Sequence, residues 1–322
     1  MTTIGFCSTS TPITAISPKR FARAKAFLTG KGVKLIAGSL TGKQDYYRSG
    51  RILDRAAEVN QLIHNDEVDI IMATIGGTNT NSILPYLDYD YLKQHPKTFV
   101  GYSDATALLL AVQTQAPNCR TLYGPALVAS FGEWPPFVDE TWAAFEKIIN
   151  TQPGHSVTIK APTYWDDEAI NWNNFDRPKQ QRPNQWQSIG ASKLTGRLMG
   201  GNLNTIYGIL GSSYFPKLTS NDLLFIEDAE KDAATVEKNF AMMRAAGLFD
   251  HVAGIILGKH ALFDDLQTNR KPIDILLEVL NNQKIPIIYD YDSCHTVPML
   301  TTPLGAQTTI DAANGTVVFS QF

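Results

Sequence analysis

Short apolar runs alternate with amphipathic helix patterns through the first half of this chain, and this alternation limits the folds it can adopt. The runs TTIGFCS, VKLIAG, VDIIMATIGG and KTFVGYS are nearly continuous in apolar residues. Helix patterns lie among them at residues 17–32, 50–67 and 104–115. Strands that are apolar along their whole length are typical of a parallel sheet covered by helices on both faces. The sequence therefore predicts a doubly wound α/β domain in the N-terminal half.

A change of amino-acid composition near residue 152 separates this half from a second α/β unit. Residues 155–187 are polar, rich in Pro and Asn, and hold three of the five tryptophans. We therefore divide the chain into an N-terminal α/β domain at 1–150, an interdomain segment with a Trp-rich loop at 151–187, and a smaller α/β domain at 188–322. The elements expected in the last part are strands at 222–230, 252–260 and 285–291, helices at 233–249 and 272–283, and a β-rich end at 301–322.

Composition argues against two classes of partner. The 322 residues are 43% hydrophobic and 18% charged, with a formal net charge of −3. That charge does not suggest a surface for a nucleic-acid polymer, and no run approaches the roughly 18 apolar residues of a membrane span. Cys7, Cys119 and Cys294 lack metal-ligand spacing, and residues 1–20 lack the pattern of a secretion signal. We expect a cytoplasmic protein.

A lone serine stands at the corner between an expected strand and an expected helix in PKTFVGYSDATALLLAVQ. Catalytic groups in open α/β sheets gather at the carboxyl ends of strands, and Gly101-x-Ser103-x-Ala105 approximates the G-x-S-x-G nucleophile elbow. The N–H groups of Asp104 and Ala105 would then lie beside an oxyanion. Alternatively, Ser103 only caps the helix, since serine is a preferred cap residue. The local pattern leaves both interpretations open.

A nucleophilic serine needs a base, and the base needs an orienting acid. Of the six histidines, His260 and His295 follow apolar runs, and His295 lies in a turn-rich loop of the kind where functional residues concentrate. Glu227 ends the run LLFI and is a candidate acid. Asp228 is its neighbour, and spacing alone does not choose between the two carboxylates.

Seven motifs occur in order along nearly the whole chain: TIGGTNTNSILPYLDYD, GYSDATALL, YGP, FGE, GRLMGGNLNTI, LFIEDAE and CHTVPMLTTPLGA. Together they resemble the LD-carboxypeptidase family of serine peptidases, the S66 type, which also contains the microcin C self-immunity proteins. In that family the serine of G-[YF]-S-D is the nucleophile, the glutamate of L-F-[IL]-E-D is the acid, and the histidine ahead of T-x-P-[LI]-G is the base. These positions match Ser103, Glu227 and His295.

The resemblance implies a flavodoxin-like or Rossmann-like N-terminal domain, a smaller swivelling α/β domain, and a catalytic triad assembled across the cleft between them. The implied reaction is amide hydrolysis without metal or organic cofactor, in which His295 takes the Ser103 proton. The oxyanion would be held by the backbone N–H groups of Asp104 and Gly77. From local sequence alone, the Gly76-Gly77 pair is a plain loop after a strand.

Two branches of the family differ in substrate. The tetrapeptide carboxypeptidases usually carry R-G-G-Y-G, whereas residues 74–79 of this chain read TIGGTN and have no arginine. This form and the Trp-rich loop resemble the microcin immunity branch, whose members cleave the amide between an aminoacyl or peptidyl group and a nucleotide-like moiety. Asn79, Trp172 and Trp186 are then candidate substrate-binding residues, with the tryptophans either stacking on a base or anchoring the loop. Cationic candidates for a phosphate-like group are Arg177, Lys179 and Arg182.

We therefore expect a serine hydrolase that acts on an aminoacyl or peptidyl nucleotide of microcin C type or on an LD-peptide of murein. The alternative within the family is a muramoyltetrapeptide carboxypeptidase of peptidoglycan recycling. A noncatalytic, two-lobed small-molecule binding protein is a further alternative. A glutamine-amidotransferase-like enzyme would need cysteine where Ser103 stands. The expected partners are a small-molecule or short-peptide substrate and a second copy in a homodimer, with no nucleic-acid polymer and no membrane.

Overall fold

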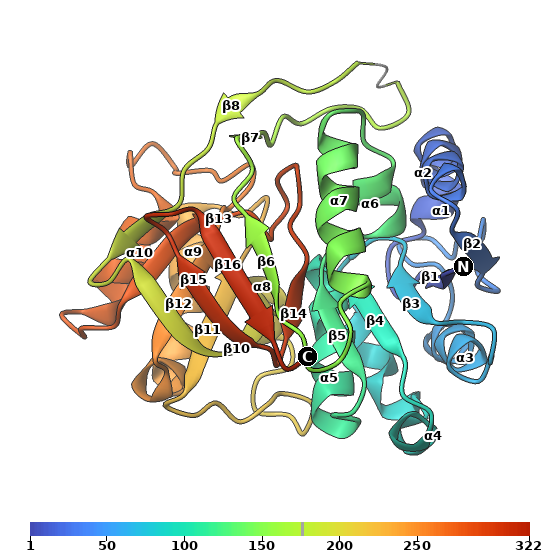
Figure 1. The fold of residues 1–322 in the computed structure, drawn as a ribbon, viewed down its shortest axis with the longest axis horizontal. Helices are drawn as coiled ribbons and strands as arrows, with labels where there is room; N and C mark the ends of the chain where they lie inside the picture. Colours follow the sequence, from blue (N-terminus) through green and yellow to red (C-terminus); the bar gives the residue numbers. More distant parts are fainter. Residues whose placement is uncertain (175–176) are drawn as a thin grey trace.

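The computed structural model describes residues 1–174 and 177–322 and contains two main sheets that lie side by side (Figure 1). In these described residues, the first sheet has six strands in the order β14-β5-β4-β3-β1-β2. The second has eight strands in the order β6-β16-β15-β10-β11-β12-β13-β9, and β7 pairs with β8 in a separate ribbon. The two-domain α/β fold that the sequence predicts is confirmed.

The N-terminal sheet is parallel except at one edge. Strands β1 to β5 follow the order 2-1-3-4-5, which is the flavodoxin-like order, and β14 joins β5 in antiparallel direction. Strands β1 and β3 are buried along their whole length, as their apolar composition predicts. The bounds are β1 (Thr3–Cys7), β2 (Lys34–Ala37), β3 (Ile70–Ala73), β4 (Thr98–Gly101), β5 (Arg120–Tyr123) and β14 (Thr302–Leu304).

Helices follow the strands of this sheet and cover it. The expected helices at 17–32, 50–67 and 104–115 correspond to α2, α3 and α5, whereas α6 and α7 were not predicted. Every helix in the described part of the chain falls short of the length and apolarity of a bilayer span. The bounds are α1 (Ile13–Ile16), α2 (Pro18–Gly30), α3 (Ile52–Ile63), η1 (Thr80–Tyr86), α4 (Tyr89–Gln94), η2 (Ser103–Ala105), α5 (Thr106–Gln115), α6 (Leu127–Phe131) and α7 (Phe137–Ile149).

The second sheet is mixed. Strands β10 to β13 run parallel, and antiparallel strands flank them on both sides. The bounds of its strands and of the ribbon are β6 (Val157–Lys160), β7 (Tyr164–Trp165), β8 (Arg182–Pro183), β9 (Gln187–Ile189), β10 (Lys193–Asn202), β11 (Asp222–Glu227), β12 (Gly254–Gly258), β13 (Ile287–Tyr291), β15 (Gln307–Asp311) and β16 (Thr316–Ser320). Its helices are α8 (Leu203–Tyr207), α9 (Ala233–Ala245), η3 (Leu248–His251) and α10 (Pro272–Leu280).

Two strands belong to a sheet outside the part of the chain in which the proposed boundaries place them. The expected interdomain segment at 151–187 contributes β6 to the C-terminal sheet, while β14 leaves the C-terminal part and joins the N-terminal sheet. Residues 175–176 of that segment lie outside the described residues. The division into 1–150, 151–187 and 188–322 stays a prediction.

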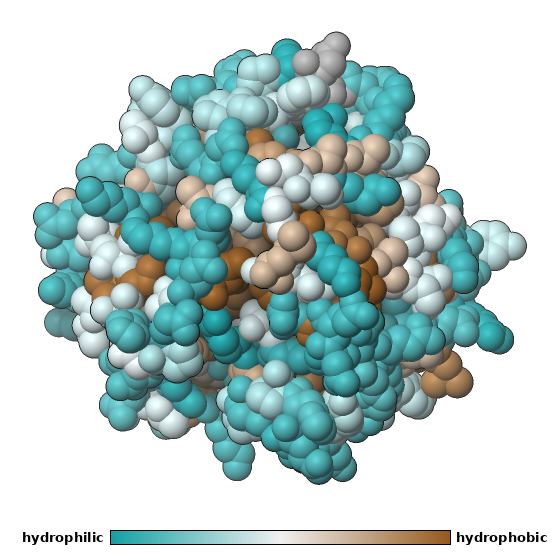
Figure 2. Space-filling model, turned by 45° about the vertical axis from the view of Figure 1, so that its right-hand side comes forward, coloured by the Kyte–Doolittle hydropathy of each residue, from teal (hydrophilic) through white to brown (hydrophobic). Residues whose placement is uncertain are grey.

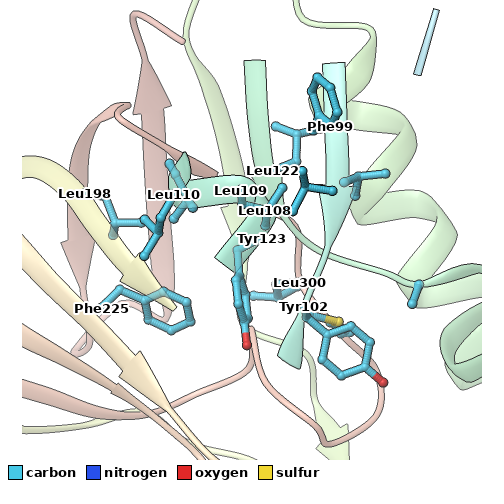
Figure 3. Packing of buried hydrophobic residues seen from close by; sticks show 14 of the residues in the cluster. Phe99, Tyr102, Leu108, Leu109, Leu110, Leu122, Tyr123, Leu198, Phe225 and Leu300 are labelled. Atoms are coloured by element: carbon cyan, nitrogen blue, oxygen red, sulfur yellow. The ribbon is translucent and has the colours of Figure 1, made fainter. Parts of the chain in front are cut away.

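Aromatic side chains join the two sheets in the core. Tyr123 at the end of β5 meets Phe225 of β11, with ring centroids 5.1 Å apart, and Figure 3 shows the Tyr123 hydroxyl pointing away from the leucine cluster. The surface in Figure 2 is largely hydrophilic, with hydrophobic residues gathered towards its middle. The contact between the sheets places the ends of β4, β5 and β11 near one another.

Candidate active site

Ser103 stands on a strained turn between β4 and α5. Its φ of 60° lies in the left-handed region, which residues other than glycine rarely adopt. The Ser103 N–H donates to the Tyr123 hydroxyl at 3.1 Å. Neither η2 nor α5 has a side-chain cap hydrogen bond, so Ser103 does not act as a helix cap in this structure. This local geometry is that of a nucleophile elbow.

Two glycines allow the chain to pass close to this turn. A Cβ atom on Gly76 would lie 2.7 Å from Ser103 Oγ and 2.9 Å from the Asp104 backbone nitrogen. A Cβ atom on Gly101 would lie 2.9 Å from the Cβ of Ala105. These distances are too short for a side chain at either position. The turn after β3 therefore lies directly against Ser103.

His295 and Glu227 form a hydrogen-bonded pair beside this turn. The distance between His295 Nδ1 and Glu227 Oε2 is 2.7 Å, and Glu227 is fully buried at the carboxyl end of β11. The second carboxylate oxygen, Oε1, accepts hydrogen bonds from the Tyr123 hydroxyl and from Asn202 Nδ2. The Tyr102 ring meets the imidazole edge to face, with centroids 4.8 Å apart. Glu227 is therefore held on three sides by donors.

Burial and charge act in opposite directions on this pair. Burial by itself lowers the pKa of His295, but the charge and hydrogen bond of Glu227 outweigh it and raise that pKa above its usual value. Burial by itself raises the pKa of Glu227, but His295 and the donors Tyr123 and Asn202 bring it below its usual value. The pair therefore favours a charged carboxylate beside a readily protonated imidazole.

Ser103 and His295 both line a cavity of about 510 Å³ between the two domains. This volume lies in the usual range for small-molecule sites, roughly 300 to 1,000 Å³. Among the described residues, no hydrogen bond joins the Ser103 hydroxyl to His295, and such contacts often tighten only with substrate bound. Other lining residues come from both domains and from the Trp-rich segment, among them Thr11, Thr78, Asn81, Asn204 and Lys231.

The two backbone groups predicted for an oxyanion hole both belong to residues of the cavity wall. Gly77 lines the cavity with a φ of 150°, which glycine adopts readily. Asp104 lies in the first turn of η2, and its side chain accepts a hydrogen bond from the Thr80 N–H at 2.9 Å. The carboxylate of Asp104 thus supports the turn. Binding of an oxyanion by the backbone N–H groups of Asp104 and Gly77 stays a prediction.

The three predicted substrate-binding residues occupy different environments. Trp172 is partly buried and lines the cavity, with the Arg20 guanidinium 4.2 Å from its ring centroid. Trp186 is only 2% exposed, lies outside the cavity wall, and donates its indole N–H to Asp292 at 2.7 Å. The loop-anchor alternative fits Trp186. The structure thus brings Trp172, but not Trp186, to the site.

The side chain of Asn79 is hydrogen-bonded within the protein and does not line the cavity. Its side-chain oxygen accepts hydrogen bonds from Ser10 at 2.8 Å and Arg55 at 2.9 Å. Its neighbours Thr78 and Asn81 line the cavity instead. In this conformation Asn79 shapes the loop, and direct contact between its side chain and a substrate stays a prediction.

The three predicted cationic side chains all have acidic partners. Lys179 lies 3.6 Å from Glu133 and lines the cavity. Arg182 contacts Asp166 at 2.7 Å and also Asp167, and Arg177 pairs with Glu168. Only Lys179 of the three is in the cavity wall. In the described part of the chain, no group of three or more His, Cys, Asp or Glu is arranged to hold a metal ion.

Sequence reasoning missed two side chains that hold the carboxylate of Glu227. Tyr123 and Asn202 end β5 and β10, and both donate to Glu227. Tyr123 also accepts from the Ser103 N–H and so connects the serine turn to the acid. Their position at strand ends was a usable signal, because polar residues there meet at one edge of the fold.

Comparisons with known proteins find similar sequences over nearly the whole chain. Residues 4–124 match the LD-carboxypeptidase N-terminal domain, and residues 195–310 match the LD-carboxypeptidase C-terminal domain. The chain is 52% identical to the Vibrio cholerae protein named "Putative carboxypeptidase VC_A0337", covering 97% of this chain and 93% of that protein. It is 47% identical to the microcin C7 self-immunity protein MccF of Escherichia coli, covering 99% and 93%.

Solved structures of MccF resemble the whole fold. The apo wild-type structure matches with a TM-score of 0.96 and 47% identity, covering 100% of this chain and 96% of that one. Another structure with the same score, identity and coverage is described as a complex with aspartyl sulfamoyl adenosine. An MccF-like protein of Bacillus anthracis matches with a TM-score of 0.87 and 26% identity, covering 100% and 97%.

Proposed function

Since the chain belongs to the LD-carboxypeptidase family, we propose that it is a serine hydrolase that cleaves an amide bond through Ser103, His295 and Glu227. The observation that carries the proposal is the buried Glu227 carboxylate, 2.7 Å from Nδ1 of the partly buried His295, which lines the same cavity as a serine held at positive φ. A nucleophile, a base and an orienting acid are the groups that acyl transfer requires.

The reaction follows from these side chains. The Ser103 hydroxyl attacks the amide carbonyl carbon, and its proton passes to Nε2 of His295 while Nδ1–H donates to Glu227. The negative charge that forms on the carbonyl oxygen is stabilised by the backbone N–H groups of Gly77 and Asp104. The carbon–nitrogen bond breaks as His295 protonates the leaving nitrogen. Water then hydrolyses the acyl ester on Ser103, with His295 again acting as the base.

The proposed substrate is an aminoacyl group joined through an amide to a nucleotide-like moiety. Two observations support it: MccF, 47% identical to this chain, has a structure described as a complex with aspartyl sulfamoyl adenosine, and Trp172 presents an aromatic ring to the cavity. A base stacked on that ring would place the leaving group at the Trp-rich segment. Hydrolysis of a murein LD-tetrapeptide is the second candidate, favoured by the LD-carboxypeptidase domain matches.

The test compares aspartyl sulfamoyl adenosine with an LD-tetrapeptide, each incubated with wild-type protein and with Ser103→Ala and followed by mass spectrometry. We expect cleavage of the aminoacyl nucleotide by the wild type and a loss of several orders of magnitude in Ser103→Ala. Cleavage of the tetrapeptide alone would assign the protein to the carboxypeptidase branch. Equal turnover by the wild type and Ser103→Ala would reject the nucleophile.

A further inference from the structure

The cavity wall contains five carboxylates, and four of them are held by partners within the protein. Asp104 accepts from the Thr80 N–H, Asp167 and Glu168 pair with arginines, and Asp228 accepts from Asn202 Nδ2 and from the backbone N–H groups of Ala229 and Asn204. The Thr80 N–H lies 2.9 Å from the Asp104 carboxylate, and Arg177 lies 3.1 Å from Glu168. Asp228 is 3.2 Å from Asn202 Nδ2, 2.9 Å from the Ala229 nitrogen and 3.1 Å from the Asn204 nitrogen. Arg182 is the arginine that pairs with Asp167. The fifth carboxylate is Glu230.

Glu230 differs from the other four. Within residues 1–174 and 177–322, its carboxylate has no hydrogen bond and no ion pair, although the side chain is exposed in the cavity wall. Its backbone is nevertheless fixed: φ is 55° and the N–H donates to the Ala261 carbonyl at 2.8 Å. A non-glycine residue at positive φ in a ligand cavity is a common sign of a functional constraint. The fold therefore presents a free negative charge from a rigid position.

Glu230 lines the same cavity as Ser103 and His295. It follows Glu227 by three residues on the extension of β11, and Ala229 pairs there with Ala261 on the extension of β12. The charge of Glu230 also contributes to the raised pKa of His295, so the two side chains interact electrostatically. A cation bound to Glu230 would accordingly lie in the cavity that Ser103 and His295 also line.

Resting on the proposed function, we propose that Glu230 binds the free α-ammonium group of the acyl residue whose carbonyl carbon Ser103 attacks. A charge-assisted hydrogen bond between a carboxylate and an ammonium is stronger than a neutral one, and it strengthens as substrate displaces water. The α-nitrogen is bonded to the Cα atom, and this Cα atom is bonded to the scissile carbonyl carbon. A residue inside a peptide chain has an acylated α-nitrogen without charge. Glu230 thus adds one contact for an aminoacyl substrate that a peptidyl substrate lacks.

The experiment measures kcat/KM for aspartyl sulfamoyl adenosine and for its N-acetyl derivative with wild type, Glu230→Gln and Glu237→Gln. Glu237 lies exposed on α9 outside the cavity wall, so its substitution makes the same change of charge elsewhere. We expect the wild type to prefer the free amine. Glu230→Gln should lose about tenfold on the amine, mainly through KM, while the N-acetyl compound changes less than about twofold. Glu237→Gln should keep both values.

Equal losses on the two compounds in Glu230→Gln would overturn the inference, as would an unchanged preference for the amine. If the wild type cleaves neither compound, the proposed function fails separately. Calorimetric binding of aspartyl sulfamoyl adenosine to Ser103→Ala, with and without Glu230→Gln, then decides the role of Glu230. About tenfold weaker binding in the double variant supports the role, and equal or absent binding in both rejects it.

Discussion

Replacing Glu227 with Gln tests the electrostatics of the site at its most buried group. The side chain keeps its size but loses its charge in a fully buried position where it meets His295, Tyr123 and Asn202. Tyr123 and Asn202 both donate to Oε1, so the new carboxamide oxygen is favoured there and its NH₂ group faces His295 Nδ1. That nitrogen must then accept, which places the ring proton on Nε2, where the base is needed.

The expected loss in kcat is about 10⁴-fold, the size known for the wrong histidine tautomer in a serine protease triad, or about 5 kcal/mol in activation free energy. The pH profile should change as well. Wild-type kcat/KM requires neutral His295, so it rises with pH through a pKa that Glu227 holds above the usual histidine value. Without that charge, burial lowers the pKa of His295, and the rising limb of the residual activity should move to lower pH.

Asp228→Asn is the matched control, because this neighbouring carboxylate is also buried and accepts three hydrogen bonds but does not contact His295. The fold-loss in kcat caused by Asp228→Asn should be at least about 100 times smaller than the fold-loss caused by Glu227→Gln. Steady-state kinetics of both variants between pH 5 and about 9 give both readouts, with circular dichroism as the check on folding. A larger loss in Asp228→Asn, or an unshifted limb in folded Glu227→Gln, would refute the assignment of the acid.

Three further predictions concern the serine turn, its link to the acid and the tryptophans. Ser103→Gly should abolish turnover while raising the free energy of unfolding by about 1 kcal/mol, because glycine relieves the positive φ; chemical denaturation would show the opposite sign if the turn is unstrained. Tyr123→Phe should lower kcat about 10- to 100-fold and destabilise by about 1–3 kcal/mol, since it removes the only side-chain oxygen that joins the Ser103 N–H to Glu227 among the described residues; unchanged kcat would contradict this. Trp172→Ala should raise KM for an aminoacyl nucleotide by the equivalent of about 1–3 kcal/mol with little change in Tm, whereas Trp186→Ala should cost about 3–5 kcal/mol in stability. Tm and KM values of the two variants in the reverse pattern would reject this distinction.

The alternation of apolar runs and helices was enough to predict the fold class, because each run had to be covered on both faces. It did not predict β6, which supplies an outer strand with alternating burial, or the crossing of β14 into the N-terminal sheet. Those pairings depend on which sheet edge is unoccupied, and this is a property of the assembled fold. Helix α7 was missed as well, although its buried residues follow a helical period.

The elbow at Ser103 was predictable because its signal is local: a serine at the corner between a strand and a helix, with small flanking residues. The choice between Glu227 and Asp228 was not, because adjacent residues at a strand end differ only in the face towards which they point. In the structure Glu227 points to His295, while Asp228 accepts from the N–H groups of Ala229 and Asn204. The family resemblance, and not the local pattern, distinguishes Glu227 from Asp228.

The two tryptophans differ for a reason that no local pattern contains. An indole buried in a core needs an acceptor for its N–H, and Trp186 finds one in Asp292, 106 residues further along the chain. Asp292 also pairs with Lys259 and accepts from Asn184, so one buried carboxylate fixes the end of the Trp-rich segment to the C-terminal domain. Trp172 meets a guanidinium instead and keeps part of its surface in the cavity. Asp292 precedes His295 by three residues. The carboxylate that holds Trp186 away from the cavity therefore also ties the segment carrying Trp172 to the loop that carries His295.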